Sequence, residues 1–267
     1  MLALLFVMGQ KEKERPAGYV ADFCPICRGI TRFRVMRHSV ATHVYGLSLG
    51  DGQLLRHMAV CRLCGNSKKV HPARYETISS TDERDLDRLI AATYPQIRES
   101  YGERLAIEVK LRNRQAEMTP DERHDFLMEP FNYLIPAVEA RYQKDVQFDK
   151  ESGIAGLGTI GLSVLTFIVC SKLWPDPPAH DWVSLMTGWV LVVGSAYTFV
   201  QLCLGPGRYL RKKVIPDLAR ALKPLNPSRD ELEECLAALR DAKLKIGTKV
   251  KPQQLWFALQ LAQPVRS

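Results

Sequence analysis

The sequence lacks the short motifs that identify several large classes of enzyme. It contains no HExxH metalloprotease motif, no GxSxG nucleophile motif and no glycine-rich phosphate-binding loop. It also has no internal repeat and no low-complexity tract. We therefore predict a protein that is not an enzyme.

Cysteine is also scarce. The 267 residues include 7 cysteines, and a chain of this length and cysteine content is not a small disulfide-stapled secreted domain. Hydrophobic residues make up 46% and charged residues 25%, which excludes fibrous, collagen-like and wholly disordered proteins. The opening segment MLALLFVMG has no basic residue before its apolar stretch and no cleavage site. We expect a first strand at residues 2–7 there, and no secretory signal.

Long uncharged runs are what the sequence does have. Residues 152–171 and 182–207 contain no Asp, Glu, Lys or Arg, and a helix needs about 20 apolar residues to cross a bilayer. The short link between the runs contains three prolines, which cannot continue a helix. We predict an antiparallel transmembrane hairpin with spans at 152–174 and 182–205. A pair of buried helices in a soluble bundle is the alternative.

Residues around the hairpin predict how it packs and which way it faces. Small residues recur every four positions on the first span, at Ala155, Thr159 and Ser163, and would let the two helices approach closely. Trp174 and Trp182 are expected at the lipid headgroups. The second span is followed by four basic residues, namely Arg208, Arg211, Lys212 and Lys213. Basic flanks stay cytoplasmic, so we expect an integral protein of a bacterial inner membrane with both termini in the cytoplasm.

Charge divides the chain into four parts. Residues 1–71 carry 11 basic and 4 acidic side chains, residues 72–151 carry 12 and 17, and residues 208–267 carry 13 and 6. We predict a multi-part α+β membrane protein. Its parts are an N-terminal β-rich zinc ribbon (1–71), an acidic helical segment (72–151), the transmembrane hairpin (152–207) and a basic, mostly helical cytoplasmic tail (208–267).

Local patterns place the strands and helices. Short β-type runs separated by turn residues predict four strands, at 18–23, 30–37, 41–49 and 54–60, with a hairpin turn at Gly50-Asp51-Gly52. Capping boxes predict three helix starts, at Ser80–Glu83, Thr119–Glu122 and Ser228–Glu231. Residues 100–117 fit a strand or a helix, and their charge density favours a helix. Residues 243–251 alternate basic and mostly apolar side chains, which predicts a basic strand followed by a helix from Pro252.

Two CxxC turns are the strongest chemical signal. Cys24 and Cys27 form the first turn, and Cys61 and Cys64 form the second. Two such turns brought together by strands would complete a tetrahedral site of four thiolates. A site with all four positions filled is structural and not catalytic, so we expect structural Zn²⁺, with iron for electron transfer as the alternative. Nearby histidines, which are His38, His43 and His57, are expected to be surface or strand residues.

The N-terminal part of the chain resembles a known type of metal-binding domain. The stretch LLFVMGQKEKERPAGYVADFCPICRGITRFRVMRH, with CRLCG after it, is similar to the zinc-ribbon domains of uncharacterised bacterial membrane-associated proteins. The similarity covers residues 3–71, about a quarter of the chain. It implies a rubredoxin-like ribbon fold with the four cysteines as metal ligands, and it implies no enzymatic activity. One departure is Arg28, which stands where the first turn often has glycine.

Other groups of charged, histidine and cysteine side chains are weaker indications of function. Eight basic residues are expected on one ribbon face, namely Arg28, Arg32, Arg34, Arg37, Arg56, Arg62, Lys68 and Lys69. With Phe33 and Tyr45 as stacking residues they would suit nucleic acid, but anionic lipid is favoured for a membrane-anchored chain. Acidic and histidine side chains of the middle segment are expected on solvated helix faces; they are Glu122, His124, Asp125, Glu129 and Glu139. The isolated cysteines Cys170, Cys203 and Cys235 are expected to be packing residues.

These observations lead to three functional hypotheses. The first is a membrane-anchored zinc ribbon that acts as a non-catalytic interaction or scaffold module at the cytoplasmic face, with a protein partner or a second copy of itself. The second is a membrane-tethered ribbon that binds nucleic acid. The third is a redox protein with iron bound to the four cysteines.

Overall fold

The structure is a computed structural model. It describes residues 8–44, 47–48, 50, 52–112, 118–143, 150–173 and 179–262. The chain divides into two compact units. The sheet unit contains Met1–Leu134, Pro216–Ala237 and Pro252–Ser267, and the hairpin unit contains Ile135–Ile215 and Ala238–Lys251. The strand predicted at residues 2–7 lies outside the described residues.

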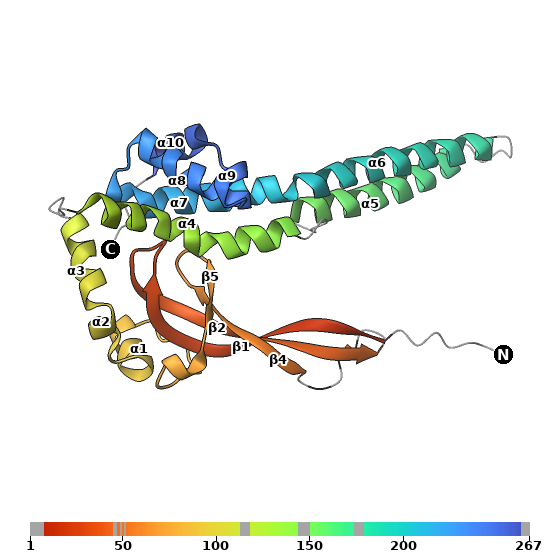
Figure 1. Ribbon diagram of the computed structural model, residues 1–267. Coiled ribbons are helices and arrows are strands. Elements are labelled where there is room, and N and C mark those ends of the chain that lie inside the picture. Colours follow the sequence, from red (N-terminus) through yellow and green to blue (C-terminus); the bar gives the residue numbers. More distant parts are fainter. Residues whose placement is uncertain are drawn as a thin grey trace. The chain divides into compact units, whose positions relative to one another are not determined.

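The sheet unit is built on an antiparallel sheet (Figure 1). Its strands are β1 (Met8–Cys24), β2 (Gly29–Val44), β3 (Leu47–Ser48), β4 (Gln53–Cys61) and β5 (Ser67–Val70). The order is β1-β2-β4-β5, and β3 pairs with β2. The strands predicted at 18–23, 30–37 and 54–60 are confirmed. The separate strand predicted at 41–49 is wrong, because β2 continues without a turn residue through Val44.

The predicted glycine turn lies between β3 and β4, but the predicted hairpin is wrong, because these two strands both pair with β2 and not with each other. Gly50 and Gly52 have φ values of 76° and 73°, in the left-handed region that glycine adopts without strain. A Cβ atom on Gly52 would lie 2.4 Å from the carbonyl oxygen of Val40. Gly52 therefore allows the chain to pass close to β2 before it enters β4.

The sheet buries side chains on both of its faces near the cysteine turns. Val20, Phe33 and Val35 are fully buried on one face. On the other face, Ala21 packs with a cluster of side chains from α1 (Leu86–Thr93) and the start of α2 (Ile97–Ser100). This end of the sheet is therefore enclosed, as a buried metal site requires.

The helix starts follow the predicted capping signals in two cases of three. At the start of α4 (Pro120–Gln143), the amide of Thr119 donates to Glu122 at 2.9 Å and the amide of Glu122 donates to the Thr119 hydroxyl at 3.3 Å. Ser228 and Glu231 form the same reciprocal pair before α8 (Arg229–Asp241). The capping box predicted at Ser80–Glu83 is wrong, because the next helix begins at Leu86 and Asp85 caps it.

The remaining helices settle two further predictions. Residues 102–112 form α3 (Gly102–Arg112), which confirms the helix that charge density favoured. The basic strand predicted at 243–251 is wrong, because that segment contains the short helix α9 (Lys245–Lys249). Ile246, Gly247 and Val250 are buried whereas Thr248 is exposed, which fits one face of a helical turn and not the alternation of a strand. The predicted helix after Pro252 is present as α10 (Pro252–Leu261). The sheet unit also contains η1 (Pro72–Arg74), α7 (Ile215–Leu222, from Pro216) and η3 (Lys223–Leu225).

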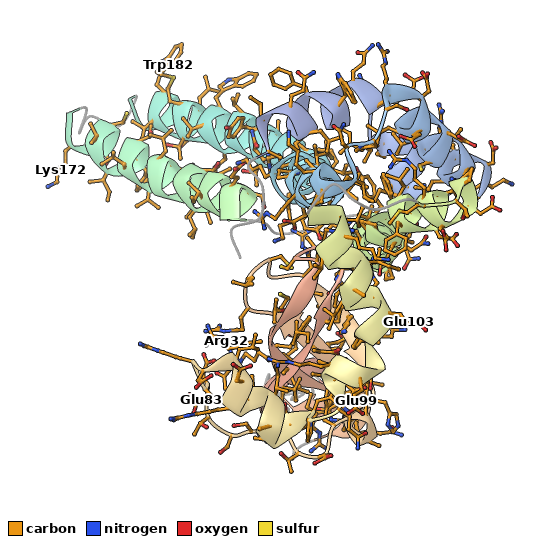
Figure 2. The ribbon with its side chains drawn as sticks, turned by 90° about the vertical axis from the view of Figure 1, so that its left-hand side faces the viewer. Arg32, Glu83, Glu99, Glu103, Lys172 and Trp182 are labelled. Atoms are coloured by element: carbon orange, nitrogen blue, oxygen red, sulfur yellow. The ribbon has the colours of Figure 1, made fainter. Side chains whose placement is uncertain are left out.

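The hairpin unit contains two long helices, α5 (Lys150–Leu173) and α6 (Ala179–Tyr209), followed by a π-helical turn η2 (Leu210–Val214). Both are long and apolar enough to cross a membrane. Lys172 and Trp182 lie at the same end of this pair (Figure 2). Trp174 and the three prolines of the link lie outside the described residues.

Small residues bring α5 and α6 together, as the sequence predicted. The hydroxyl oxygens of Thr159 and Thr198 are 3.4 Å apart. A Cβ atom on Gly194 would lie 2.3 Å from the Thr159 methyl carbon, so a larger residue there would push the helices apart. Ser163, another of these small residues on α5, is also buried, at 5% exposed.

Candidate metal centre

The four cysteines singled out from the sequence lie together in the sheet unit. They are all buried, and their sulfur atoms lie within 4.8 Å of one another. The Sγ atoms of Cys24 and Cys64 are 3.6 Å apart, and those of Cys27 and Cys61 are 3.8 Å apart. A tetrahedron with metal–sulfur bonds of 2.3 Å has edges of about 3.8 Å. These two distances match the edges of such a tetrahedron, so the cluster could hold a four-coordinate metal ion.

Strand pairing positions both turns. The first turn connects β1 to β2, and the second connects β4 to β5. Phe33 of β2 pairs with Cys61 of β4, which places the second turn beside the first. The amide of Cys61 donates to the carbonyl of Asn66 at 2.8 Å, and the amide of Gly65 donates to the carbonyl of Cys61 at 2.9 Å. The second turn is thus held by backbone hydrogen bonds.

The residue that follows each cysteine pair has a left-handed backbone. Gly65 has φ of 70°, and Arg28 has φ of 55° at the equivalent position of the first turn. The departure noted in the sequence is therefore real: an arginine adopts the conformation that glycine adopts in the other turn. Such a conformation costs a residue with a side chain about 1–2 kcal/mol.

The thiols influence one another strongly. Hydrogen bonds with Cys24 and Cys27 lower the pKa of Cys61, and the same two partners lower the pKa of Cys64. Hydrogen bonds with the other three thiols raise the pKa of Cys24. The Thr31 hydroxyl lies 3.4 Å from the Cys61 sulfur and can donate to a thiolate. Four thiolates in a buried site would repel one another, and a bound cation would offset that repulsion.

A buried ion pair anchors the first turn. The Nε atom of Arg28 lies 2.8 Å from a carboxylate oxygen of Glu108 on α3, and both side chains are 3% exposed. Nη1 of Arg28 donates to the carbonyl of Ala221 on α7 at 2.9 Å. Arg104 also contacts Glu108, at 2.8 Å, and pairs with Glu129 on α4. Arg28 is therefore bonded directly to helices α3 and α7. It is connected to α4 through Glu108 and Arg104.

A second polar contact anchors the second turn. The side-chain amide of Asn66 donates to the carboxylate of Asp217 on α7 at 2.8 Å, and both residues are buried. Asn66 also holds Cys61 through its carbonyl oxygen. Helix α7 thus contacts the first turn at Ala221 and the second at Asn66.

A buried carboxylate lies two residues before the first cysteine. Asp22 is 0% exposed and accepts hydrogen bonds at 2.7 Å from Tyr75 and 3.3 Å from Tyr101. The ammonium of Lys68 lies 2.7 Å from the same carboxylate and donates to the Phe23 carbonyl at 2.9 Å. Burial, followed by Asp22, raises the pKa of Tyr75 and of Tyr101. These polar side chains around Asp22 connect β1, β5 and the segment after β5. The cluster was not predicted from the sequence.

One tyrosine near the cysteines has no hydrogen-bond partner among the described residues. The hydroxyl of Tyr133 on α4 is buried, and no partner for it exists among the described residues. Burial raises its pKa, and the four cysteines raise it further. Tyr133 was not singled out from the sequence, because nothing in its surroundings there distinguishes it.

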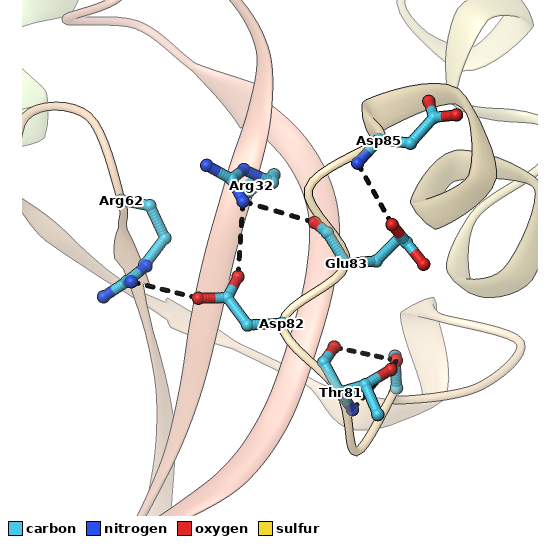
Figure 3. A network of polar contacts seen from close by, with 7 residues as sticks. Arg32, Arg62, Thr81, Asp82, Glu83 and Asp85 are labelled. Carbon is cyan, nitrogen blue, oxygen red and sulfur yellow. Dashed lines mark hydrogen bonds and ion pairs between the residues drawn. The ribbon is translucent and has the colours of Figure 1, made fainter.

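The predicted basic face is largely occupied by acidic partners. Arg28 is buried against Glu108, and Lys68 is paired with Asp22. Figure 3 shows Asp82 between two arginines, and its carboxylate oxygens lie 3.4 Å from Arg32 and 3.0 Å from Arg62. The remaining members have no ion pair within the described residues; they are Arg34, Arg37, Arg56 and Lys69. The expected surface position is therefore wrong for Arg28, which is buried, whereas Arg32, Arg62 and Lys68 are at least partly exposed but have acidic partners.

The residues expected to stack on nucleic-acid bases do not form an exposed platform. Phe33 is 0% exposed and lies under the Lys68 ammonium, 5.0 Å from its ring centre, so its predicted stacking role is wrong. Tyr45 lies outside the described residues. The predicted strand positions of His38 and His57, on β2 and β4, are confirmed. Neither belongs to the cysteine group, and the described part of the chain holds no second group of three or more metal-binding side chains.

The acidic side chains of the middle segment have structural partners. Glu122 caps α4, Glu129 pairs with Arg104, and Glu139 accepts from the backbone amide of Lys245 at 2.5 Å. His124 and Asp125 join no metal-binding group within the described residues.

The basic residues after the second span lie near an acidic residue at the start of α5. Arg208 is 2.9 Å from Glu151, and Lys212 also pairs with it. Arg211 and Lys213 follow on η2. These four residues therefore mark one end of the hairpin, where the sequence placed them.

The isolated cysteines differ in their surroundings. Cys235 of α8 is fully buried, as expected, and burial raises its pKa to about 11. Cys170 is half-buried, and Cys203 is exposed, so the predicted packing role is wrong for Cys203.

Comparisons with known proteins add no family assignment. No protein-family model, no curated protein and no solved structure matches the chain. The resemblance to zinc ribbons therefore depends on the cysteine cluster and its β-sheet setting.

Proposed function

We propose that this protein is a membrane-anchored zinc-ribbon protein that acts as a non-catalytic interaction or scaffold module. Cys24, Cys27, Cys61 and Cys64 would hold one structural Zn²⁺ in the sheet unit. Helices α5 and α6 would anchor the chain in a bacterial inner membrane with both termini in the cytoplasm. Its partner would be another protein or a second copy of the chain.

The closed cysteine site is the observation that carries the proposal. Four buried sulfur atoms within 4.8 Å of one another would fill all four positions around a Zn²⁺ ion and leave none for a substrate or a reactive water. The site joins two turns that lie 34 or more residues apart in the sequence, and each turn is tied to a distant helix. A metal ion there would stabilise the fold, because binding free energy at a structural site is also folding free energy.

The surface of the hairpin supports the membrane anchor. Only 6% of the most apolar 18-residue stretch of each helix is buried. Helices of this length in the core of a soluble protein would bury most of that surface, and an apolar patch of this extent is unfavourable in water. The basic residues at the open end of the hairpin support a cytoplasmic location for that end.

Two alternatives have less support. A redox protein with iron would use the same four sulfur atoms, and metal identity alone distinguishes it. A nucleic-acid-binding ribbon would need free cations and stacking rings, but half of the predicted cations are paired or buried and Phe33 is buried.

Elemental analysis of the full chain, purified in detergent, tests the metal. We expect about one zinc per chain. Cys61→Ser should lose the metal, because it removes one of four ligands. Cys203→Ser is the matched control, since Cys203 is exposed and lies outside the cysteine group, and this variant should retain zinc. Iron in the parent protein, or no metal together with a titratable dithiol, would contradict the proposal and favour redox chemistry.

Alkaline extraction of cell membranes tests the anchor. The full chain should stay in the membrane pellet, as proteins with spanning helices do. Release into the supernatant would show that α5 and α6 do not span the bilayer. Accessibility of both termini to a protease in inverted vesicles, with protection in intact spheroplasts, would support the proposed orientation.

A further inference from the structure

One face of helix α4 lies toward the first cysteine turn. Phe126, Glu129 and Tyr133 are three or four residues apart along the helix, so they share this face. The guanidinium carbon of Arg104 lies 4.0 Å from the ring centre of Phe126, and Arg104 also pairs with Glu129. Through Glu108, Arg104 is connected to the first turn. Tyr133 therefore lies on the face of α4 that contacts the ion pairs behind that turn.

The hydroxyl of Tyr133 is buried in the sheet unit, and it has no hydrogen-bond partner among the described residues. Phe131 and Leu134, its neighbours on the same helix, are 0% and 1% exposed. Buried tyrosine hydroxyls usually have a partner, because an unpaired hydroxyl has given up its hydrogen bonds to water and lowers stability. Tyr133 is therefore a candidate donor to an acceptor group beside it.

The cysteine cluster supplies negative charge beside this hydroxyl. Burial raises the pKa of Tyr133, and the charges of Cys24 and Cys64 raise it further. The other two cysteines act in the same direction. The sulfur atoms of Cys24 and Cys64 are 3.6 Å apart and form one edge of the cluster. Metal ligands must be thiolates, and a charged sulfur accepts a stronger hydrogen bond than a thiol does.

The cluster already contains a hydroxyl in a comparable position on its other edge. The Thr31 hydroxyl lies 3.4 Å from the sulfur of Cys61, and the sulfur atoms of Cys61 and Cys27 are 3.8 Å apart. Thr31 can thus donate to the edge formed by Cys27 and Cys61. A donor for the edge formed by Cys24 and Cys64 would have to come from another element, and α4 carries a buried hydroxyl beside it.

We propose that the Tyr133 hydroxyl donates a hydrogen bond to the sulfur edge formed by Cys24 and Cys64 when a metal ion is bound. The inference rests on the structural metal site proposed above. Tyr133 is a positioning residue, since it would act through the ligands and not on the metal. Its hydrogen bond would lower the charge density on sulfur and orient the ligands, as groups behind the metal ligands do in general. It would also hold α4 against the cysteine turns.

Cobalt spectroscopy of the full chain in detergent tests the hydrogen bond. A Co²⁺ ion bound by four thiolates has a sulfur-to-metal charge-transfer band, and the energy of this band depends on how readily sulfur donates electrons. Tyr133→Phe keeps the ring and removes the hydroxyl alone. A thiolate that has lost a hydrogen bond donates electrons more readily, so we expect the band to shift to longer wavelength in this variant. A role in packing alone would leave the band in place.

Tyr142→Phe is the matched control for this measurement. Tyr142 lies on the same helix and is half-buried, and burial raises its pKa without a contribution from the cysteines. The control should have the charge-transfer band of the parent protein. Equal band positions in Tyr133→Phe and Tyr142→Phe would overturn the inference.

Competition with a chelator gives a second readout. Removing a group that hydrogen-bonds to a metal ligand weakens metal binding about 10- to 100-fold. We therefore expect the zinc dissociation constant of Tyr133→Phe to rise about tenfold or more, and that of Tyr142→Phe to stay unchanged. Tyr133→Leu removes the ring as well. If Tyr133→Phe binds zinc like the parent and only Tyr133→Leu binds it more weakly, the ring packs against the site and the hydrogen bond is refuted.

The metal content of the same samples separates this inference from the function on which it rests. A parent chain that binds neither zinc nor cobalt contradicts both, because the thiolate acceptors then do not form. Iron in the purified chain contradicts the zinc proposal alone, since cobalt would still report on the same sulfur atoms. A parent chain that binds zinc and cobalt, with both readouts equal in Tyr133→Phe and Tyr142→Phe, contradicts the hydrogen bond alone.

Discussion

The two cysteine turns require the same backbone conformation and reach it with different residues. The second turn uses Gly65, which is exposed and has φ of 70°. The first turn uses Arg28, which is 3% exposed and has φ of 55°. Glycine adopts this conformation without strain, whereas arginine does so at a cost of about 1–2 kcal/mol. The strain at Arg28 must be offset by what its side chain contacts.

The anchors of the two turns differ in the same way. Arg28 forms a buried ion pair with Glu108 and a hydrogen bond to α7, while the second turn is held to α7 by the amide of Asn66. Breaking a buried ion pair costs more than losing one hydrogen bond, because an uncompensated charge stays buried. The first turn therefore depends on a charged side-chain anchor, whereas the second is held by its backbone hydrogen bonds and by an uncharged donor, the Asn66 amide.

The largest expected effect comes from removing the partner of Arg28. Glu108→Ala leaves Arg28 buried without its carboxylate and should lower the free energy of unfolding by about 3–5 kcal/mol. The measurement is a urea titration of the zinc-loaded full chain in detergent, followed by metal release to a chelator. Glu233→Ala is the control, because Glu233 pairs with Arg229 at the exposed surface and should cost about 1 kcal/mol or less. Equal midpoints for the two variants would show that the anchor is not needed.

Two substitutions of Arg28 separate its strain from its anchor. Arg28→Ala and Arg28→Gly both lose the ion pair, but only the glycine variant also relieves the left-handed strain. We expect both to be less stable than the parent protein and Arg28→Gly to be more stable than Arg28→Ala by about 1–2 kcal/mol. The same urea titration measures the difference. Equal stability of the two variants would mean that φ at this position carries no strain.

The elements that the sequence predicted correctly have local signals. Alternating runs predicted the cores of β1, β2 and β4, Gly50 and Gly52 predicted a turn before β4, and Thr119 with Glu122 predicted the start of α4. The CxxC spacing predicted the cysteine cluster for the same reason, since each turn is complete within a few residues. The basic strand predicted at 243–251 is wrong, because Gly247 is buried and Thr248 is exposed, which does not fit a strand with its even-numbered residues toward the core.

The contacts that support the cysteine site could not be predicted from the sequence. Arg28 and Glu108 are 80 residues apart, and Asn66 and Asp217 are 151 residues apart. Each belongs to a residue type that is usually solvated, so no local pattern distinguishes a buried pair from surface residues. The arginine in place of glycine was the single available signal, because a strained backbone implies a side chain with a compensating contact.

The smallest expected effect comes from giving the second turn a side chain. Gly65→Ala should lower the free energy of unfolding by about 1–2 kcal/mol, because alanine is strained at positive φ and gains no anchor there. Gly65→Asn should cost less, since asparagine tolerates the left-handed region better than alanine does. Gly102→Ala at the start of α3 is the control, where an added Cβ meets no atom within 4 Å and should leave stability unchanged or slightly raised. If Gly65→Ala proves as stable as the parent in the urea titration, the second turn does not need glycine, and the contrast with Arg28 loses its physical basis.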